Sequence, residues 1–176
     1  MYGFRYRDDA ERFYRVLPKR LEKFGLEVAP EKTGISRFSR FHLSMKRRFT
    51  FVGFEFYWLE HRHRVPPVKR RTSRKKLRAA CRRIKEWIKH NRHCPGREFF
   101  WQLNARLQGH YHYYGVRGNS RSIYRFYEWA VECAFQVAQP PGRAPEFTWE
   151  QFVRVLEHVQ LARARITEAR RRRVFA

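Results

Sequence analysis

The chain has 176 residues, of which 43% are hydrophobic and 17% aromatic, and its 40 lysines and arginines against 16 acids give a formal net charge of +24. A charge this large excludes an ordinary neutral enzyme, and the apolar content excludes a disordered basic tail. The composition therefore indicates a folded protein whose partner is a polyanion.

The positive charge is concentrated in the middle of the chain. Residues 61–125 contain 19 lysines and arginines and only two acids, Glu86 and Glu98. Solvated protein surfaces normally mix charges of both signs. The middle segment is therefore predicted to bind nucleic acid, and its arginines suit bidentate contacts with phosphates.

The sequence has no recognisable targeting segment or membrane span. No uncharged apolar run approaches the roughly 18 residues that cross a bilayer, and the chain starts without an apolar signal core. We therefore expect a cytoplasmic protein with no membrane partner. The three cysteines, Cys81, Cys94 and Cys133, are odd in number and far apart, so we expect them to be reduced and structural.

The first third of the chain predicts one helix and a few strands. Apolar residues at helical spacing predict an amphipathic helix over residues 9–24, capped by Asp8 or Asp9. Pro18 lies inside this helix and can kink it, because proline has no amide hydrogen to donate. Short strands are predicted over residues 26–28 and 33–38. The aromatic and β-branched segment 49–58 is the strongest predicted strand, and Gly53 within it marks a bulge or a close backbone approach.

From about residue 72 the pattern becomes helical. Thr72 or Ser73 caps a first helix, Gly118-Asn119 precedes a third, and Thr148 with Gln151 forms a capping box for a fourth. The apolar face of the first helix comprises Leu77, Ala80, Cys81, Ile84, Trp87 and Ile88, that of the second Phe99 or Phe100, Leu103 and Leu107, and that of the third Ile123, Phe126, Tyr127, Ala130 and Ala134.

These elements predict an α+β protein in three parts. Residues 1–68 form a small piece with one helix packed on a few antiparallel strands, residues 69–166 form a basic helical bundle, and residues 167–176 form a basic tail. One helix and three strands leave sheet edges without partners. We therefore expect the first piece to belong to something larger.

Several motifs resemble the bacterial group II intron reverse transcriptases. Phe13-Tyr14-x-x-Leu17 with Gly25-Leu26-Glu27-Val28-Ala29-Pro30-Glu31-Lys32-Thr33 resembles the last segment of that family's palm, and Phe51-Val52-Gly53-Phe54 is similar to its Phe-Leu-Gly-Phe strand at the palm–thumb junction. Thr72-Ser73-Arg74-Lys75-Lys76-Leu77 and Leu107-x-Gly109-x-Tyr111-x-Tyr113-Tyr114-Gly115 are similar to the thumb, or maturase, region. The resemblance covers residues 5 to about 166 in the family's order.

The resemblance places the family's catalytic motif outside this sequence. The Tyr-Ala-Asp-Asp hairpin, whose carboxylates hold Mg²⁺ in a complete reverse transcriptase, is expected upstream. Tyr6-Arg7-Asp8-Asp9 has a similar sequence, but it leads into a predicted amphipathic helix. At the start of a helix, acidic residues serve as caps or interact favourably with the helix dipole. Lys32 resembles the family's palm lysine, which lies near the incoming nucleotide. In this chain Lys32 would be vestigial unless another chain completes the palm. The chain alone is therefore expected to be inactive and to need no cofactor.

The predicted RNA-binding residues are cations of the middle segment together with neighbouring tyrosines. The turn over residues 109–117 offers aromatic rings that either stack on RNA bases or belong to the core, with Tyr114 expected to be the most buried. The full set is Lys69, Arg70, Arg71, Arg74, Lys75, Lys76, Arg78, Arg82, Arg83, Lys85, Arg106, Tyr111, Tyr113, Arg117 and Arg121, with residues 69–71 as an arm before the first basic helix.

Histidines at i, i+2 spacing offer a weaker signal. On strands, His61 with His63 and His110 with His112 would each share a face, which permits a metal ion but does not demand one, and we expect contact with solvent or RNA instead.

The function implied by the resemblance is binding of structured group II intron RNA to assist splicing and retrohoming. Two alternatives stay open. In the first, the chain is part of an active RNA-directed DNA polymerase that an upstream reverse transcriptase chain completes, and it contacts DNA or an RNA–DNA duplex. In the second, it is a non-specific basic RNA binder.

Overall fold

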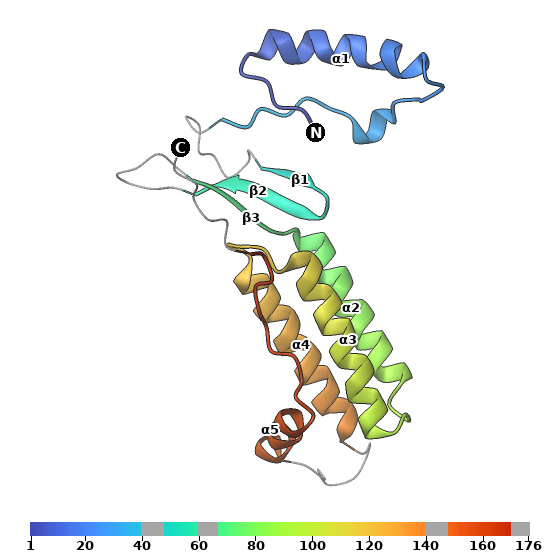
Figure 1. Ribbon diagram of the computed structural model, residues 1–176, viewed down its shortest axis with the longest axis vertical. Helices are drawn as coiled ribbons and strands as arrows, with labels where there is room; N and C mark the ends of the chain where they lie inside the picture. The colour runs from blue at the N-terminus through green and yellow to red at the C-terminus, as the bar shows by residue number, and fades with distance from the viewer. Residues whose placement is uncertain (40–47, 60–66, 140–147, 170–176) are drawn as a thin grey trace. The chain divides into compact units, whose positions relative to one another are not determined.

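The computed structural model describes residues 1–39, 48–59, 67–139 and 148–169. These residues form five α-helices, a short 3-10 helix and a three-stranded antiparallel sheet, which confirms the α+β class (Figure 1). The chain divides into two compact units, Met1–Phe49 and Thr50–Ala176. This division by spatial contacts falls before the palm–thumb boundary at residues 68/69, which comes from the resemblance and stays a prediction.

The first unit contains helix α1 (Arg7–Glu22) and a 3-10 turn (Pro30–Lys32). The cap of α1 is Tyr6, so Asp8 and Asp9 are not caps but first-turn residues, where their charge still favours the helix dipole. The helix continues through Pro18, and none of its residues is buried. The predicted strands over 26–28 and 33–38 do not form, because a strand needs a neighbouring strand for its backbone hydrogen bonds.

The sheet of the second unit has the order β1 (Phe49–Phe51), β2 (Phe54–Trp58) and β3 (Val68–Thr72). The predicted single strand over 49–58 is therefore a hairpin. Val52 (φ 47°) and Gly53 (φ 80°) both have the positive φ that a tight two-residue hairpin turn needs. The predicted bulge at Gly53 is wrong, but the predicted close approach is confirmed, because a Cβ there would lie 2.9 Å from Tyr114 Oη.

Three helices below the sheet form the bundle: α2 (Arg74–His90), α3 (Gly96–Tyr114) and α4 (Ser120–Ala138). Ser73 caps α2, and Thr148 with Gln151 forms the predicted capping box of α5 (Trp149–His158). The predicted apolar faces of the helices meet in one core. Its largest fully buried apolar side chains are Ile88, Leu103, Leu107, Tyr111 and Ile123, and the same core contains Ala80, Ile84, Phe99, Phe126, Ala130, Cys133, Phe152 and Leu156.

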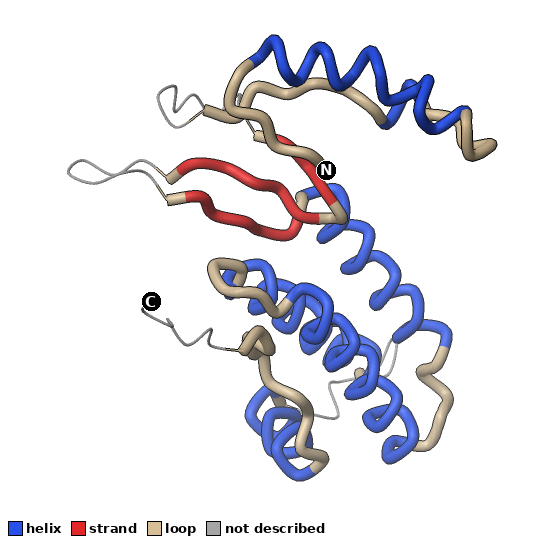
Figure 2. The backbone as a smooth tube through the Cα atoms, turned by 45° about the horizontal axis from the view of Figure 1, so that its top comes forward, coloured by secondary structure: helices blue, strands red, loops and turns tan. Residues whose placement is uncertain are grey.

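After α5 the chain returns along the bundle toward the sheet (Figure 2). Residues 161–168 run beside α3, where the Ala162 amide donates to Asn104 Oδ1 at 2.9 Å and the Thr167 amide donates to the Gly115 carbonyl at 2.8 Å. The predicted tail over 167–176 thus begins with residues that are bound to the bundle, and residues 170–176 lie outside the described part. Among the described residues, no helix has the length and apolar character needed to cross a membrane.

Candidate nucleic-acid interface

The outer face of α2 carries a continuous stripe of positive charge. Lys75, Arg78, Arg82 and Lys89 are exposed and lie opposite the buried side of the helix, which contains Ala80, Ile84 and Ile88. From Lys75 to Lys89 the stripe is about 21 Å long, at 1.5 Å per residue. The one acid of the helix, Glu86, pairs loosely with Arg82 at 3.9 Å, so most of the charge is free to meet an anion.

Two aromatic rings flank this stripe and hold neighbouring cations in place. On the α4 side, the Lys85 ammonium lies 5.4 Å from the centre of the Trp129 ring. On the α3 side, the Arg106 guanidinium lies 4.4 Å from the centre of the Trp87 ring. The negative face of an aromatic ring attracts a cation and partly offsets its charge. Lys85 and Arg106 are therefore held in position, but they are less available to bind an anion than the cations of the stripe.

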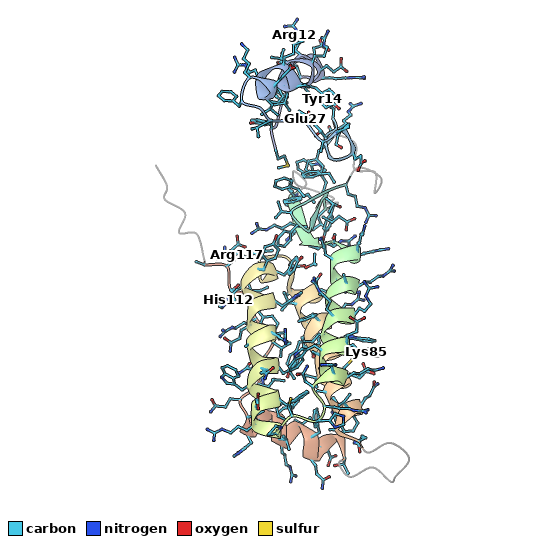
Figure 3. All side chains as sticks on the ribbon, turned by 90° about the vertical axis from the view of Figure 1, so that its right-hand side faces the viewer. Arg12, Tyr14, Glu27, Lys85, His112 and Arg117 are labelled. Atoms are coloured by element: carbon cyan, nitrogen blue, oxygen red, sulfur yellow. The ribbon has the colours of Figure 1, made fainter. Side chains whose placement is uncertain are left out.

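The other predicted cations of α2 and α4 are also exposed. Arg74, Lys76 and Arg83 lie on the edges of α2, and Arg121 lies in the first turn of α4. Figure 3 shows Lys85 midway along α2, whereas His112 and Arg117 lie at the end of α3 nearest the sheet; Arg12, Tyr14 and Glu27 belong to the first unit. The surface of the bundle therefore offers cations over several turns of α2.

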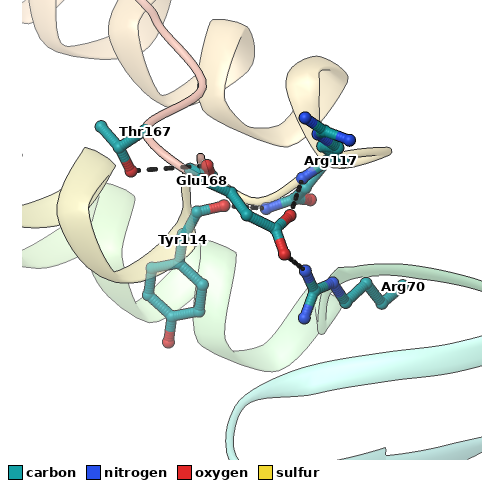
Figure 4. Close-up of polar contacts among 7 residues, drawn as sticks. Arg70, Tyr114, Arg117, Thr167 and Glu168 are labelled. Atoms are coloured by element: carbon teal, nitrogen blue, oxygen red, sulfur yellow. Dashed lines mark hydrogen bonds and ion pairs between the residues drawn. The ribbon is translucent and has the colours of Figure 1, made fainter. Parts of the chain in front are cut away.

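The predicted arm over residues 69–71 is wrong, because these residues belong to strand β3, whose side chains alternate between the two faces of the sheet. Lys69 is half-buried opposite Tyr57. Arg71 pairs with Glu55 at 2.6 Å and lies 5.0 Å from the centre of the Tyr57 ring. Arg70 points the other way and pairs with Glu168 (Figure 4). Arg70 and Arg71 are therefore already neutralised within the fold.

Glu168 joins three separate parts of the unit. One of its carboxylate oxygens accepts from Arg70 of β3, and the other accepts from the backbone amide of Arg117 at 2.7 Å, in the turn between α3 and α4 (Figure 4). Hydrogen bonds from Arg70 and Arg117 lower the pKa of Glu168. The Arg117 side chain itself stays exposed.

The three tyrosines at the end of α3 have three different environments. Tyr111 is completely buried and its hydroxyl donates to the Ala162 carbonyl at 3.1 Å, so it cannot stack on a base. Burial also raises the pKa of Tyr111 well above its ordinary value. Tyr114 is half-buried against Phe54, and Tyr113 is 50% exposed while its hydroxyl donates to the Val52 carbonyl. The prediction that Tyr114 is the most buried was therefore wrong.

The predicted turn over 109–117 is mostly helix, because α3 extends to Tyr114. On a helix the i, i+2 spacing separates side chains, so His110 and His112 do not share a face. His110 stacks on Phe126 with ring centres 3.7 Å apart, and burial lowers its pKa to about 4. His112 is exposed, and His61 and His63 lie outside the described residues. No group of three potential metal ligands occurs in the part of the chain that the structure describes.

The residues predicted from the palm resemblance fall in two places. Asp8 and Asp9 are exposed on the first turn of α1, and Lys32 ends the 3-10 turn of the same unit. The junction motif over residues 51–54 forms the tip of the β1–β2 hairpin.

Asn119 is a site residue that the sequence analysis missed. It is 1% exposed, accepts from the Thr72 amide, and donates to Thr72 Oγ1 and the Tyr114 carbonyl, all at 2.8 Å. These three bonds connect β3 to the ends of α3 and α4, and so hold the sheet against the bundle beside the start of α2. The only sequence signal was a Gly-Asn pair before a helix, which also fits an ordinary cap.

Comparison of the chain with protein-family models, curated proteins and solved structures found no match. A rigid helix with a stripe of exposed lysines and arginines, one weakly paired acid and aromatic rings at its edges is suited to contact a chain of phosphates.

Proposed function

We propose that this protein binds structured RNA through the outer face of α2, and that the RNA is a group II intron. The observation that carries RNA binding is the stripe of Lys75, Arg78, Arg82 and Lys89, exposed on a helix whose opposite side is fixed in the core. The choice of intron RNA rests on the resemblance of residues 72–77 and 107–115 to the thumb, or maturase, region of group II intron reverse transcriptases.

The same proposal assigns residues 1–68 to the end of a palm and the helices that follow to a thumb. Two features support this assignment. The junction motif over residues 51–54 lies at a hairpin immediately before the bundle, and Gly53 fits closely under Tyr114 of the thumb-like motif. The first unit supplies an amphipathic helix with none of its residues buried, as expected of a segment that belongs to a larger palm.

The bound protein would assist splicing through linkage alone. If the stripe on α2 contacts phosphates that come together only in the folded intron, the protein binds that state more tightly and shifts the RNA toward it. Rigid presentation is important, because a cation fixed by the helix loses less conformational entropy on binding than one on a mobile arm. The transesterification steps stay with the RNA.

The direct test is a titration of the purified chain with a group II intron RNA in the presence of excess tRNA, over a range of salt concentrations. We expect the intron to be preferred at least tenfold, which corresponds to about 1.4 kcal/mol of specificity. Displacement of the intron by tRNA in proportion to mass would support the non-specific basic binder instead.

A variant can locate the binding face. Lys75→Ala, Arg78→Ala and Arg82→Ala together should weaken binding and flatten its dependence on salt, by about one unit of log–log slope for each phosphate that the variant no longer neutralises. The matched control is Arg12→Ala, Lys19→Ala and Lys23→Ala, which removes three exposed cations from the first unit. If the slope falls equally in both variants, binding follows net charge alone and the assignment to α2 is wrong.

A further inference from the structure

A groove between α4 and α5 has the opposite character to the rest of this basic protein. It has a volume of about 640 Å³ and lies between residues 124–132 of α4 and residues 149–163, which form α5 and the start of the segment after it. Its lining is aromatic and acidic and comes from both helices, chiefly Tyr124, Tyr127, Glu128, Glu132, Trp149 and Glu157.

Two of the three acids in the lining are not neutralised within the described part of the chain. Glu128 and Glu132 are exposed one turn apart on α4, and neither makes an ion pair with another described residue. Glu157 pairs with Arg163 at 3.2 Å, and Arg163 is the one cation among the described residues of the lining. Like charges one helical turn apart repel each other. Because Glu128 and Glu132 stay unpaired in a chain with 40 cations, the groove is locally negative on a molecule of net charge +24.

The groove also offers fixed apolar surface. Val131, Leu156 and Leu161 are buried along it, while Trp149 is 48% exposed and Tyr124 is 56% exposed. The Trp149 ring packs edge-on against Phe135, with ring centres 5.1 Å apart, so it is held in position. A rigid, half-exposed aromatic ring beside buried aliphatic side chains is the kind of surface that receives an apolar anchor from a partner.

We propose that this groove binds a basic peptide segment of a partner protein. An aliphatic or aromatic side chain of the peptide fills the groove beside Trp149 and Tyr124, and arginines or lysines on either side of it face Glu128 and Glu132. Charge complementarity selects this occupant. A nucleic acid would be repelled by the carboxylates, and a cationic peptide would be repelled by the exposed cations of α2.

The probe is a synthetic peptide with a central leucine and phenylalanine flanked on each side by two arginines, titrated calorimetrically into the full chain without RNA. We expect saturable binding with one peptide per chain. A second peptide with glycines in place of leucine and phenylalanine should bind at least tenfold more weakly, because it keeps the charges and loses the anchor. Equal affinity of the two peptides, or no saturable binding, would overturn the proposal.

The site is located with charge-matched variants. Glu128→Gln with Glu132→Gln should raise the Kd of the leucine–phenylalanine peptide at least tenfold. Glu86→Gln with Glu98→Gln makes the same change in net charge outside the groove and should alter the Kd less than twofold. Tyr124→Ala, at a position that is 56% exposed, should weaken binding without removing a charge.

Two other results would also overturn this assignment. Equal effects of the two double variants would mean that the peptide responds to net charge alone. A native chain that dimerises in ultracentrifugation, and that Glu128→Gln with Glu132→Gln converts to a monomer, would make a second copy the occupant. Because no RNA is present, either failure leaves the proposed RNA binding of α2 untouched.

Discussion

Val52 holds an unfavourable backbone conformation at the tip of the β1–β2 hairpin. Its φ of 47° lies in the left-handed region, where a β-branched side chain is strained, and the side chain is 56% exposed. Gly53, which follows at φ 80°, has no such strain and leaves room for the Tyr114 hydroxyl. The turn therefore has the backbone of an Asn-Gly hairpin with an unfavourable residue at its first position.

Replacing Val52 with a residue that tolerates positive φ should stabilise the protein. We expect Val52→Asn to raise the free energy of unfolding by about 1 kcal/mol, because asparagine adopts the left-handed region more easily. Urea denaturation of the two proteins measures the difference. Val52→Thr is the control, since it keeps the β-branch and should gain nothing; an equal gain from threonine would show that the strain is not the cause.

His110 should make the bundle sensitive to mild acid. Its folded pKa of about 4 lies below the ordinary value of 6.5, because burial against Phe126 disfavours the charged ring. Between pH 6.5 and 4 the unfolded chain therefore binds a proton that the folded chain does not, and stability falls as the pH falls, by at most about 1.4 kcal/mol per pH unit.

The measurement is the free energy of unfolding at pH 7 and pH 5 for the native chain and for His110→Phe. Phenylalanine fills a similar space, and His110 Nε2 has no hydrogen-bond partner among the described residues to lose. We expect the variant to lose less stability on acidification than the native chain. Equal losses in the two proteins would mean that His110 is already solvated in the folded state.

The elements of the second unit are held together by polar contacts at their ends as well as by the core. Asn119 connects β3 with α3 and α4, and the Ser73 amide donates to the Gly53 carbonyl at 2.9 Å, which connects the hairpin turn to the start of α2. The basic stripe of α2 starts two residues after this junction. The direction in which the stripe faces therefore depends on these few bonds.

Asn119→Ala should be strongly destabilising. It removes three hydrogen bonds and leaves the buried Thr72 amide and the Tyr114 carbonyl without those partners, so we expect a loss of about 3 kcal/mol. Thermal or urea unfolding gives the value. Asn104→Ala, which removes one half-buried bond to the Ala162 amide, is the matched control, with an expected loss of about 1 kcal/mol. Similar losses would contradict a special role for Asn119.

Across the whole second unit, residues 161–168 link the α5 end of the bundle to the sheet. Glu168 secures the end of this segment through Arg70 and the Arg117 amide. Because these contacts lower its pKa, Glu168 contributes stability at pH values above its ordinary pKa of 4.5, and that contribution is lost as the pH falls below it.

Glu168→Gln should loosen this segment without unfolding the bundle. We expect faster hydrogen exchange at the amides of Thr167 and Glu168, which donate to the Gly115 carbonyl, and unchanged exchange in the core of α3. Glu157→Gln breaks an exposed ion pair with Arg163, near the start of the segment, and is the control. If the two variants exchange alike, Glu168 does not secure the segment.

Local patterns predict the starts and the buried faces of the helices of the bundle, although α3 extends to Tyr114 through part of the predicted turn. Ser73, Asn119 and Thr148 stand at the starts of α2, α4 and α5, and the apolar spacing of each helix selects the side that is buried. The pattern of residues 49–58 does not separate one strand from a hairpin, because aromatic and β-branched residues stand on both sides of Gly53. Only the positive φ at Val52 and Gly53 divides them.

The sequence alone determines that this is a basic α+β protein with its charge concentrated in the middle third of the chain, since charge and helical periodicity are properties of neighbouring residues. The tertiary structure decided which cations are available. Arg70 and Arg71 are neutralised by Glu168 and Glu55, which are distant in sequence, while Lys75, Arg78 and Lys89 are exposed and make no ion pair with another described residue. It also brought Glu128 and Glu132 of α4 together with Trp149 of α5 in one groove. Such pairings depend on the path of the whole chain, which no local pattern contains.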